Sequence, residues 1–269
     1  MAKSMQLWLI AFILFLLSAV YQRVTGPTHP VRGGSEFAGE KITYRFNRSH
    51  SELSDHQVKI NISNPDITGV LSYKRFKMDD PWTDVPMQRE GENLVGFLPQ
   101  QPLAGKLQYQ IKLQSGDKVW NIPGDGAIII RFAGPVPKLI LYSHILFMAL
   151  AMLFSSRAGL EALIRRGDPR KFVYWTLATM FLGGLVLGPI VQKYAFGEFW
   201  TGWPLGHDLT DNKTVVAFIF WLVAYFIGRR GRSARGWVLA AALITLTVYL
   251  IPHSVLGSEL DYGAPPAAP

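Results

Sequence analysis

The apolar residues of this chain gather in long runs that lie outside residues 23–135. A helix that spans a membrane needs roughly 20 largely apolar residues, because each residue advances it only about 1.5 Å through the hydrocarbon core. Five runs approach or reach this length once flanking Ser, Thr, Gly and Tyr are counted. These runs constrain the fold more than any other feature, and they are Met5–Tyr21, Leu139–Phe154, Phe172–Val191, Thr214–Ile227 and Trp237–Ile251.

Composition supports a membrane protein. Charged residues make up 17% of the 269 residues, whereas an average soluble domain has about 25%. The net charge of +8 does not indicate a nucleic-acid partner, because most of the excess lies beside the apolar runs, where Lys and Arg set topology. The chain has no cysteine, so disulfides, thiolate metal sites and thioether-linked haem are excluded. We expect the lipid bilayer as a partner.

The distribution of charge predicts the orientation. The loops Ser155–Lys171 and Gly228–Gly236 are rich in arginine, so the positive-inside rule places both in the cytoplasm. The loop Gln192–Lys213 and the tail after Pro252 carry more acidic than basic residues and belong outside. With five spans, the N-terminus lies inside and residues 22–137 are exported. We therefore predict a multi-pass protein of the inner (plasma) membrane, with its C-terminus on the periplasmic side.

The sequence pattern of the exported region predicts short strands. Apolar and polar residues alternate over short stretches, and turn signals such as Asn64-Pro65-Asp66 and Ser115-Gly116-Asp117 separate them. This regular spacing predicts an all-β sandwich. The expected strands are Lys41–Phe46, Gln57–Ile62, Gly69–Phe76, Leu94–Leu98, Leu107–Leu113 and Ala127–Phe132.

Three segments of this region, Pro81–Met87, Phe97–Pro99 and Leu107–Ile111, resemble immunoglobulin-like and fibronectin type III-like domains. In such domains a Trp-x-x-Val-Pro-Met strand leads to a strand that ends in Pro, and a Tyr-x-Ile strand pairs back. The resemblance implies an immunoglobulin-like sandwich but no function, because this fold hosts many unrelated functions. Apolar packing must join the sheets, and Trp82 and Tyr109 are the expected core aromatics.

Four parts follow from these patterns. Residues 1–22 are predicted to be a membrane anchor, with a cleaved signal peptide as the alternative, although Ser18–Tyr21 is a poor cleavage site. Residues 36–133 form the exported sandwich, and residues 137–256 form a four-helix membrane domain. Residues 257–269 are rich in Pro and Ala and are predicted to be a disordered tail.

Two short polar segments of the exported region are predicted to lack regular structure. Gly33-Gly34-Ser35 is typical of a flexible linker. His50 and His56 lie in and beside the polar segment Ser49–Asp55, which reads as a solvated loop rather than a metal site.

The loop between the third and fourth spans is rich in aromatic residues and ends in a polar cluster. One interpretation is an interfacial belt, because Trp and Tyr settle at the level of the lipid headgroups. Asp208 and Asp211 would then cap the fourth helix, with Asp211 as the favoured cap. The aromatic residues of this interface are Tyr194, Phe199, Trp200 and Trp203.

Three histidines, His144, His207 and His253, are predicted to lie at the same outward face of the membrane domain. An ionisable residue inside a span is a functional-site hypothesis by default, and a neutral imidazole can bind haem iron, chlorophyll magnesium or a transition metal. We predict His144 and His253 as cofactor ligands, and His207, Asp208 and Asp211 as metal ligands. The alternative is that each histidine only hydrogen-bonds a neighbouring helix.

Two functions from different classes fit these features. The favoured one is a non-catalytic accessory or scaffolding subunit of a larger membrane complex for photosynthetic or respiratory electron transfer, with other membrane subunits as partners. Its sandwich would bind or brace an exported partner. The alternative is a membrane redox or metal/haem-binding protein with a His/carboxylate site at the outward face. No catalytic set is visible, and the sequence shows no inverted repeat that would favour transport.

Overall fold

The structure is a computed structural model in which the chain divides into two compact units. The first, the membrane unit, comprises Met1–Pro27 and Val136–Ser258, and the second, the β unit, comprises Thr28–Pro135 and Glu259–Pro269. The residues that the structure describes are 2–164, 167–206, 208–229, 233–252, 257 and 259–263.

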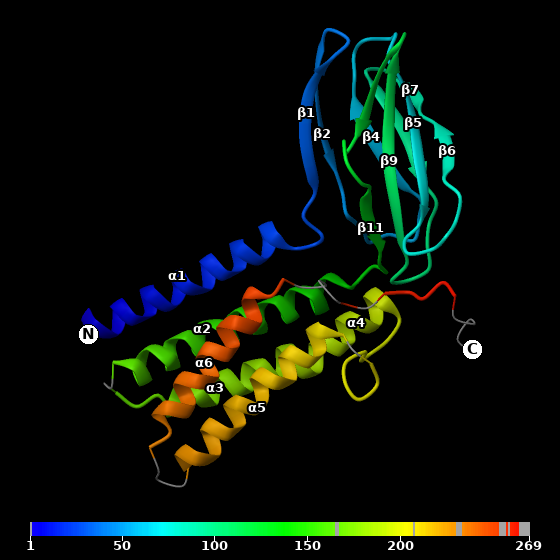
Figure 1. The fold of residues 1–269 in the computed structure, drawn as a ribbon. Coiled ribbons are helices and arrows are strands. Elements are labelled where there is room, and N and C mark those ends of the chain that lie inside the picture. Colours follow the sequence, from blue (N-terminus) through cyan, green and yellow to red (C-terminus); the bar gives the residue numbers. More distant parts are fainter. Residues whose placement is uncertain are drawn as a thin grey trace. The chain divides into compact units, whose positions relative to one another are not determined.

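The membrane unit is built from helices (Figure 1), and each of the five apolar runs is helical, except for Ile251 at the end of the fifth run. The third run is interrupted by a π-helical segment, η1. The bounds are α1 Ala2–Thr25, α2 Lys138–Leu163, α3 Arg170–Met180, η1 Phe181–Leu187, α4 Gly188–Phe196, α5 Leu209–Arg229 and α6 Arg235–Leu250.

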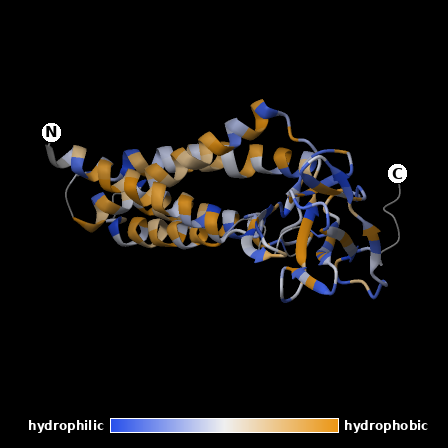
Figure 2. Cartoon of the chain, turned by 90° about the horizontal axis from the view of Figure 1, so that it is seen from above, coloured by the Kyte–Doolittle hydropathy of each residue, from blue (hydrophilic) through white to orange (hydrophobic). Residues whose placement is uncertain are grey.

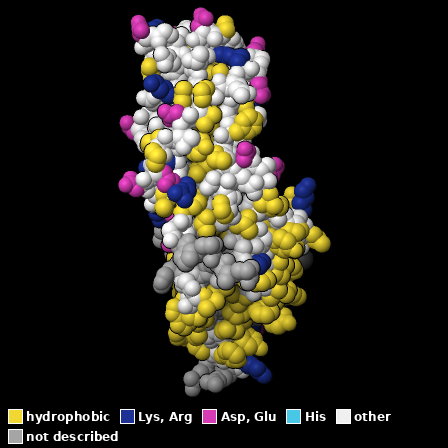
Figure 3. Space-filling model, turned by 90° about the vertical axis from the view of Figure 1, so that its right-hand side faces the viewer, with side chains coloured by type: hydrophobic (Ala, Val, Ile, Leu, Met, Phe, Trp, Pro, Cys, Tyr) yellow, Lys and Arg dark blue, Asp and Glu magenta, His cyan; other side chains and the backbone are white. Residues whose placement is uncertain are grey.

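Four helical stretches are long and apolar enough to cross a membrane: Ser4–Thr25, Lys138–Leu163, Arg170–Phe196 and Leu209–Arg229. The fifth helix, α6, is apolar but has only 16 residues. Hydrophobic residues run along these helices in Figure 2, and hydrophobic side chains cover the face of the membrane unit seen in Figure 3. The chain therefore combines helices that are apolar enough to span a membrane with separate β-sheets, as the sequence predicts at this level.

Small residues let the helices approach closely. Helix α2 packs against α1, α3 and α6, and α5 packs against α3 and α6 (Figure 1). At Gly159 of α2, an added Cβ would lie 2.6 Å from the Cβ of Ala242 on α6. The buried Trp221 of α5 donates its indole N–H to Oγ1 of Thr245 on α6 at 2.7 Å. Such contacts replace the hydrophobic driving force, which lipid does not supply between helices.

A buried ion pair lies on α2, at a place where the sequence predicts a cytoplasmic loop. The segment from Ser155 to Leu163 is helical and belongs to α2, so the loop begins later than Ser155, and its side of the membrane stays a prediction. Nη2 of Arg157 lies 2.7 Å from Oε1 of Glu161, and these side chains are only 3% and 11% exposed. The guanidinium also lies over the rings of Trp8 and Phe172, at 5.5 and 4.7 Å from their centroids. The i,i+4 spacing and these rings let the helix carry two charges into the bundle.

The β unit has three sheets, and a strand overlaps each of the six predicted strands to within one residue at the ends where the prediction runs further. The largest sheet has the order β3-β11-β9-β5-β6, with β10 also paired to β9; the second is β4-β8-β7, and the third is the hairpin β1-β2. Every pair is antiparallel except β11 with β3. The bounds are β1 Val31–Phe37, β2 Glu40–Phe46, β3 Ser49–His50, β4 His56–Asn61, β5 Thr68–Arg75, β6 Thr83–Pro86, β7 Gln88–Glu90, β8 Asn93–Leu98, β9 Lys106–Ser115, β10 Lys118–Ile122 and β11 Ile128–Phe132.

Residues from all three sheets share one hydrophobic core. Burial alternates along β4 and β9, as expected for strands with one face turned inward. Tyr109 is fully buried, as predicted, and its hydroxyl donates to the carbonyl of Asn47 at 3.2 Å. The prediction for Trp82 is wrong. This residue is 39% exposed, because it precedes the edge strand β6, and Nζ of Lys74 lies 5.6 Å from its ring centroid.

The predicted Gly33-Gly34-Ser35 linker is also wrong, because these residues belong to β1. An added Cβ at Gly33 would lie 2.6 Å from Cζ of Tyr44, its partner on β2. The glycine therefore serves sheet packing, since it leaves room for the Tyr44 ring over the strand.

His56 is not part of a solvated loop, because it begins β4 and is buried. Its Nδ1 lies 3.2 Å from Nδ1 of His50, and the ring of His50 packs edge-on against Phe132. Burial, together with the nearby His50, lowers the pKa of His56 to about 4. The neutral imidazole is therefore the form that this part of the β unit holds.

The chain returns to the β unit after the last helix. Residues 257–269 are predicted as a disordered tail, yet three of them make specific contacts within this unit. The N–H of Leu260 donates to the carbonyl of Ala104 at 3.1 Å, and the carboxylate of Glu259 lies 2.8 Å from Nζ of Lys106. Residues 264–269 lie outside the described part of the chain.

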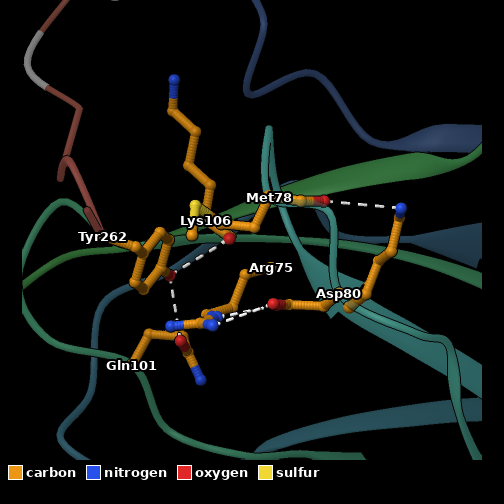
Figure 4. A network of polar contacts seen from close by, with 7 residues as sticks. Arg75, Met78, Asp80, Gln101, Lys106 and Tyr262 are labelled. Carbon is orange, nitrogen blue, oxygen red and sulfur yellow. Dashed lines mark hydrogen bonds and ion pairs between the residues drawn. The ribbon is translucent and has the colours of Figure 1, made fainter.

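Tyr262 is the centre of a second set of contacts (Figure 4). Its hydroxyl lies 2.9 Å from Oε1 of Gln101 and 3.1 Å from the carbonyl oxygen of Lys106. The guanidinium of Arg75 lies 5.3 Å from the centroid of its ring and forms an ion pair with Asp80 at 2.7 Å. The C-terminal segment is thus held on the β unit by a ring contact and by hydrogen bonds.

Candidate functional site

A cavity of about 140 Å³ lies in the membrane unit among α2, η1, α4 and the start of α5. We call this end of the unit, where α1 ends, α2 begins and α6 ends, the connection end. The lining brings together four of the residues proposed from the sequence: His144, Asp208, Asp211 and Trp200. The other lining residues are Met148, Gly184, Gly188, Val191, Gln192, Phe196, Thr210 and Thr214.

His144 is oriented by the π-helical segment. Its Nδ1 lies 2.9 Å from the carbonyl oxygen of Gly183, and a carbonyl can only accept, so Nδ1 carries the proton and Nε2 is the basic nitrogen. The same carbonyl also accepts the N–H of Gly188, as expected in a π-helix. Histidines that bind metals are commonly held in this way, with the other ring nitrogen donating to a carbonyl.

Glycine and proline explain why a π-helical segment forms here. An added Cβ at Gly183 would lie 2.9 Å from Cβ of Phe147, and one at Gly184 would lie 2.7 Å from Cγ2 of Thr214. Both glycines therefore allow α2 and α5 to approach η1. Pro189 has no N–H, and its ring would clash with the carbonyl four residues earlier in a regular helix. The widened turn of the π-helical segment accommodates the proline.

The two aspartates organise the chain that precedes α5. The carboxylate of Asp208 accepts the N–H of Thr210 at 2.6 Å, so Asp208 caps α5. The predicted cap, Asp211, instead lies in the first turn and is buried. Its Oδ2 accepts the N–H groups of Thr201 and Gly202 at 2.8 and 3.0 Å and lies 3.2 Å from Nε2 of Gln192. Asp211 thus fixes the aromatic loop against α4 and α5.

Further polar contacts at the connection end were not foreseen from the sequence. Lys213, buried on α5, donates to the carbonyl of Ile251 at 2.8 Å. Gln22 of α1 donates to the carbonyl of Tyr249 on α6, and the Tyr249 hydroxyl donates to the carbonyl of Met148 on α2 at 2.7 Å. Polar residues within apolar runs are the only sequence signal for such contacts, and their partners depend on how the helices pack.

The predicted interface aromatics are distributed between the cavity and the surface. Trp200 lines the cavity, and its indole N–H donates to the carbonyl of Trp203 at 3.2 Å. Tyr194, Phe199 and Trp203 have exposed side chains. Their placement at the level of the lipid headgroups stays a prediction.

Among the described residues, no group of three or more His, Asp or Glu side chains is arranged to hold a metal ion. His207 and His253 lie outside those residues. Typical sites for drug-sized ligands have volumes of about 300–1,000 Å³. The cavity of about 140 Å³ is smaller than this range and has the size for an ion or a small ligand.

No protein-family model, no curated protein and no solved structure matches the chain. Its function is therefore inferred from its own residues and their geometry.

Proposed function

We propose that the chain is a non-catalytic accessory subunit of a larger membrane complex, one that serves photosynthetic or respiratory electron transfer. In this proposal the helices pack on other membrane subunits, and the β unit binds or braces an exported partner.

The observation that carries this proposal is that the ionisable side chains around the cavity are hydrogen-bonded to other groups of the chain. His144 bonds to Gly183, Asp211 holds the loop before α5, and Lys213 bonds to Ile251. A general acid or base must instead reach a proton of the substrate. Side chains that brace helices and loops are what a structural subunit requires.

Chain connectivity supports the proposed topology. The β unit precedes α2, and Glu259 and Tyr262 return to it after α6. The chain between them must cross the membrane an even number of times, which four crossings by α2, α3–α4, α5 and α6 satisfy. Although α6 is only about 24 Å long by its rise per residue, this requirement supports its crossing as the fifth span, with α1 as the first.

The proposed partner-binding role of the β unit rests on its architecture. Two sheets and a hairpin share one core, and all but one of their strand pairs are antiparallel. These features support an immunoglobulin-like sandwich, an architecture that many cell-surface domains share. Under the proposed topology, this unit and the C-terminus lie on the periplasmic side of the inner membrane, and the N-terminus lies in the cytoplasm.

Site-specific cross-linking in native membranes tests the subunit proposal. A photoreactive phenylalanine analogue replaces Phe97, exposed on β8, in one strain and Phe226, exposed on α5, in another. We expect an exported polypeptide to be captured from Phe97 and a membrane subunit from Phe226. The uncross-linked complex should also migrate, after mild detergent extraction, well above the 30.1 kDa of the chain. A monomer that yields no adduct at either position would contradict the proposal.

A second candidate function is a metal or small-ligand site at the cavity. It is favoured by the hydrogen bond that leaves Nε2 of His144 basic, and by the presence of Asp208 and Asp211 in the same lining. Elemental analysis and an absorption spectrum after gentle extraction test it. A metal or visible band that is lost in His144→Ala but kept in the control His50→Ala would support this function. A colourless and metal-free wild-type protein would remove it.

A further inference from the structure

A second, larger cavity of about 680 Å³ lies at the opposite end of the membrane unit, among α3, α5 and α6. We call this end, where α2 and α5 end and α3 and α6 begin, the loop end. Buried apolar side chains form one wall of the cavity: Val173, Ala224 and Val238. These residues lie about one turn inside their helices, where the apolar part of the spans begins.

Arginines from three helices form the other part of the lining. Arg170 begins α3, Arg229 ends α5, and Arg235 begins α6. Asp168 is the acidic member of the lining, and its carboxylate lies 2.6 Å from the guanidinium of Arg170. The described lining therefore has a positive balance of charge, next to an apolar wall.

Two of these arginines keep donors for a ligand. The guanidinium of Arg229 makes no hydrogen bond or ion pair with any described residue. Arg235 donates from Nη1 and Nη2 to the carbonyls of Glu161 and Gly167, at 3.3 and 3.0 Å, and a guanidinium has five N–H donors in all. These two bonds hold the side chain at the cavity and leave other donors of its planar fork unused.

The start of α6 adds to the positive potential. Ala234 stands at the cap position and offers no side-chain hydrogen bond to the first N–H groups of the helix. The partial positive charge of the helix end therefore adds to that of the Arg235 guanidinium.

We propose that this loop-end cavity binds the phosphate-bearing headgroup of an anionic phospholipid, with the glycerol and upper acyl groups against the apolar wall. Arginine forks match phosphate oxygens in pairs, and the volume lies within the usual range for a small-molecule site. The proposal rests on the membrane embedding of the helices and not on the accessory-subunit role, and the proposed topology makes the lipid one of the cytoplasmic leaflet. A soluble phosphate ester shares the charge but gains nothing from the apolar wall.

Native mass spectrometry of the full-length protein, released from mixed vesicles of phosphatidylcholine and phosphatidylglycerol, tests the site. Arg229→Gln should weaken retention of phosphatidylglycerol by about tenfold, the effect of losing one charge-assisted hydrogen bond. Lys171→Gln is the matched control, because Lys171 is an exposed cation at the same end that does not line the cavity. The affinity of the Lys171→Gln variant for phosphatidylglycerol should fall clearly less than that of Arg229→Gln. Equal losses in the two variants, or none in either, would overturn the proposal.

One further variant and one competition experiment complete the test. Asp168→Asn, which releases Arg170 from its ion pair, should tighten the retention of phosphatidylglycerol, and unchanged or weaker retention would contradict the proposed role of the arginines. Soluble glycerol phosphate should not compete for the site. If it competes as well as the lipid and depends on Arg229, the cavity is a site for a free phosphate ester and the lipid proposal fails. Failure to capture a partner polypeptide would leave all these results unchanged.

Discussion

The buried ion pair on α2 makes the stability of the membrane unit depend on single residues. Removing one charge of a buried pair leaves its partner uncompensated, which typically costs about 3–5 kcal/mol. We therefore expect Glu161→Gln, which leaves Arg157 unpaired beneath Trp8 and Phe172, to destabilise the helical unit by this amount. Denaturant unfolding of the full chain in detergent micelles measures the effect.

Two variants serve as controls for this prediction. The pair Asp168–Arg170 is exposed, so Asp168→Asn should change the free energy of unfolding by less than about 1 kcal/mol. Replacing both buried charges with apolar residues, as in Arg157→Met with Glu161→Leu, should be nearly neutral. If Glu161→Gln costs no more than Asp168→Asn, the pair is not buried as described.

A second residue-scale prediction concerns acid. The pKa of His56 is about 4 in the folded β unit and about 6.5 in an unfolded chain. Between these values the unfolded chain binds more protons, so the stability present above pH 6.5 is lost as the pH falls toward 4. The loss should reach about 3 kcal/mol. Hydrogen exchange of β4 and β8 in the full chain, measured across this range, checks it.

His56→Phe supplies the comparison for the acid effect. This variant should flatten the pH dependence between 6.5 and 4. It should not change the further loss of stability at lower pH, because that loss comes from carboxylates that take up protons there. Asp80 is one of them, and the hydrogen bond from Arg75 lowers its pKa. An unchanged profile in His56→Phe would assign the effect to another group.

Sequence reasoning at this scale succeeds where a residue's role depends on its own strand or helix. Tyr109 is in the core because alternation along one strand already turns it inward. His56 was missed because its burial requires pairing with β8, which lies some forty residues later in the sequence. Asp208, rather than Asp211, caps α5 because the helix begins at Leu209, a start that apolar periodicity does not define to the residue.

At the scale of elements, the α2–α6 contact depends on the absence of a side chain at Gly159. Because a Cβ there would lie 2.6 Å from Cβ of Ala242, Gly159→Ala should destabilise the helical unit by about 1–3 kcal/mol. Ala242→Gly in the same chain should restore most of the loss. Thermal unfolding in detergent compares the single and double variants, and equal stability of the two would show that the helices do not meet at these residues.

The sequence predicts the long elements better than their ends and the short ones. Apolar runs locate the five helices, but α2 extends past its run because Arg157 and Glu161 pair with each other inside the bundle. Strands β3, β6 and β7 are short, β1 contains two glycines, and β10 has no regular alternation of burial, so none of these five shows the pattern that identifies the six predicted strands. The cavity at the connection end was not predictable as such, because η1 and α4 bring its walls together only after folding.

At the scale of the whole molecule, the β unit is completed by residues more than a hundred positions away from its last strand. Tyr262→Ala removes both the ring contact with Arg75 and the hydrogen bonds at Gln101 and Lys106. We expect a loss of about 1–3 kcal/mol in the stability of the β unit. Tyr262→Phe keeps the ring and should lose less. Faster hydrogen exchange of β9 in the alanine variant checks this, and identical exchange in both variants and the wild type would contradict it.

The most direct test of the account is the side of the membrane on which each segment lies. The chain has no cysteine, so single cysteines report their own positions: Asp117→Cys in the β unit, Asp261→Cys in the C-terminal segment and Ser233→Cys between α5 and α6. In spheroplasts treated with a membrane-impermeant maleimide, residues 117 and 261 should react, and residue 233 should react only after lysis. Labelling of residue 233 together with residue 117, or of residue 261 only after lysis, would contradict the proposed arrangement of the helices.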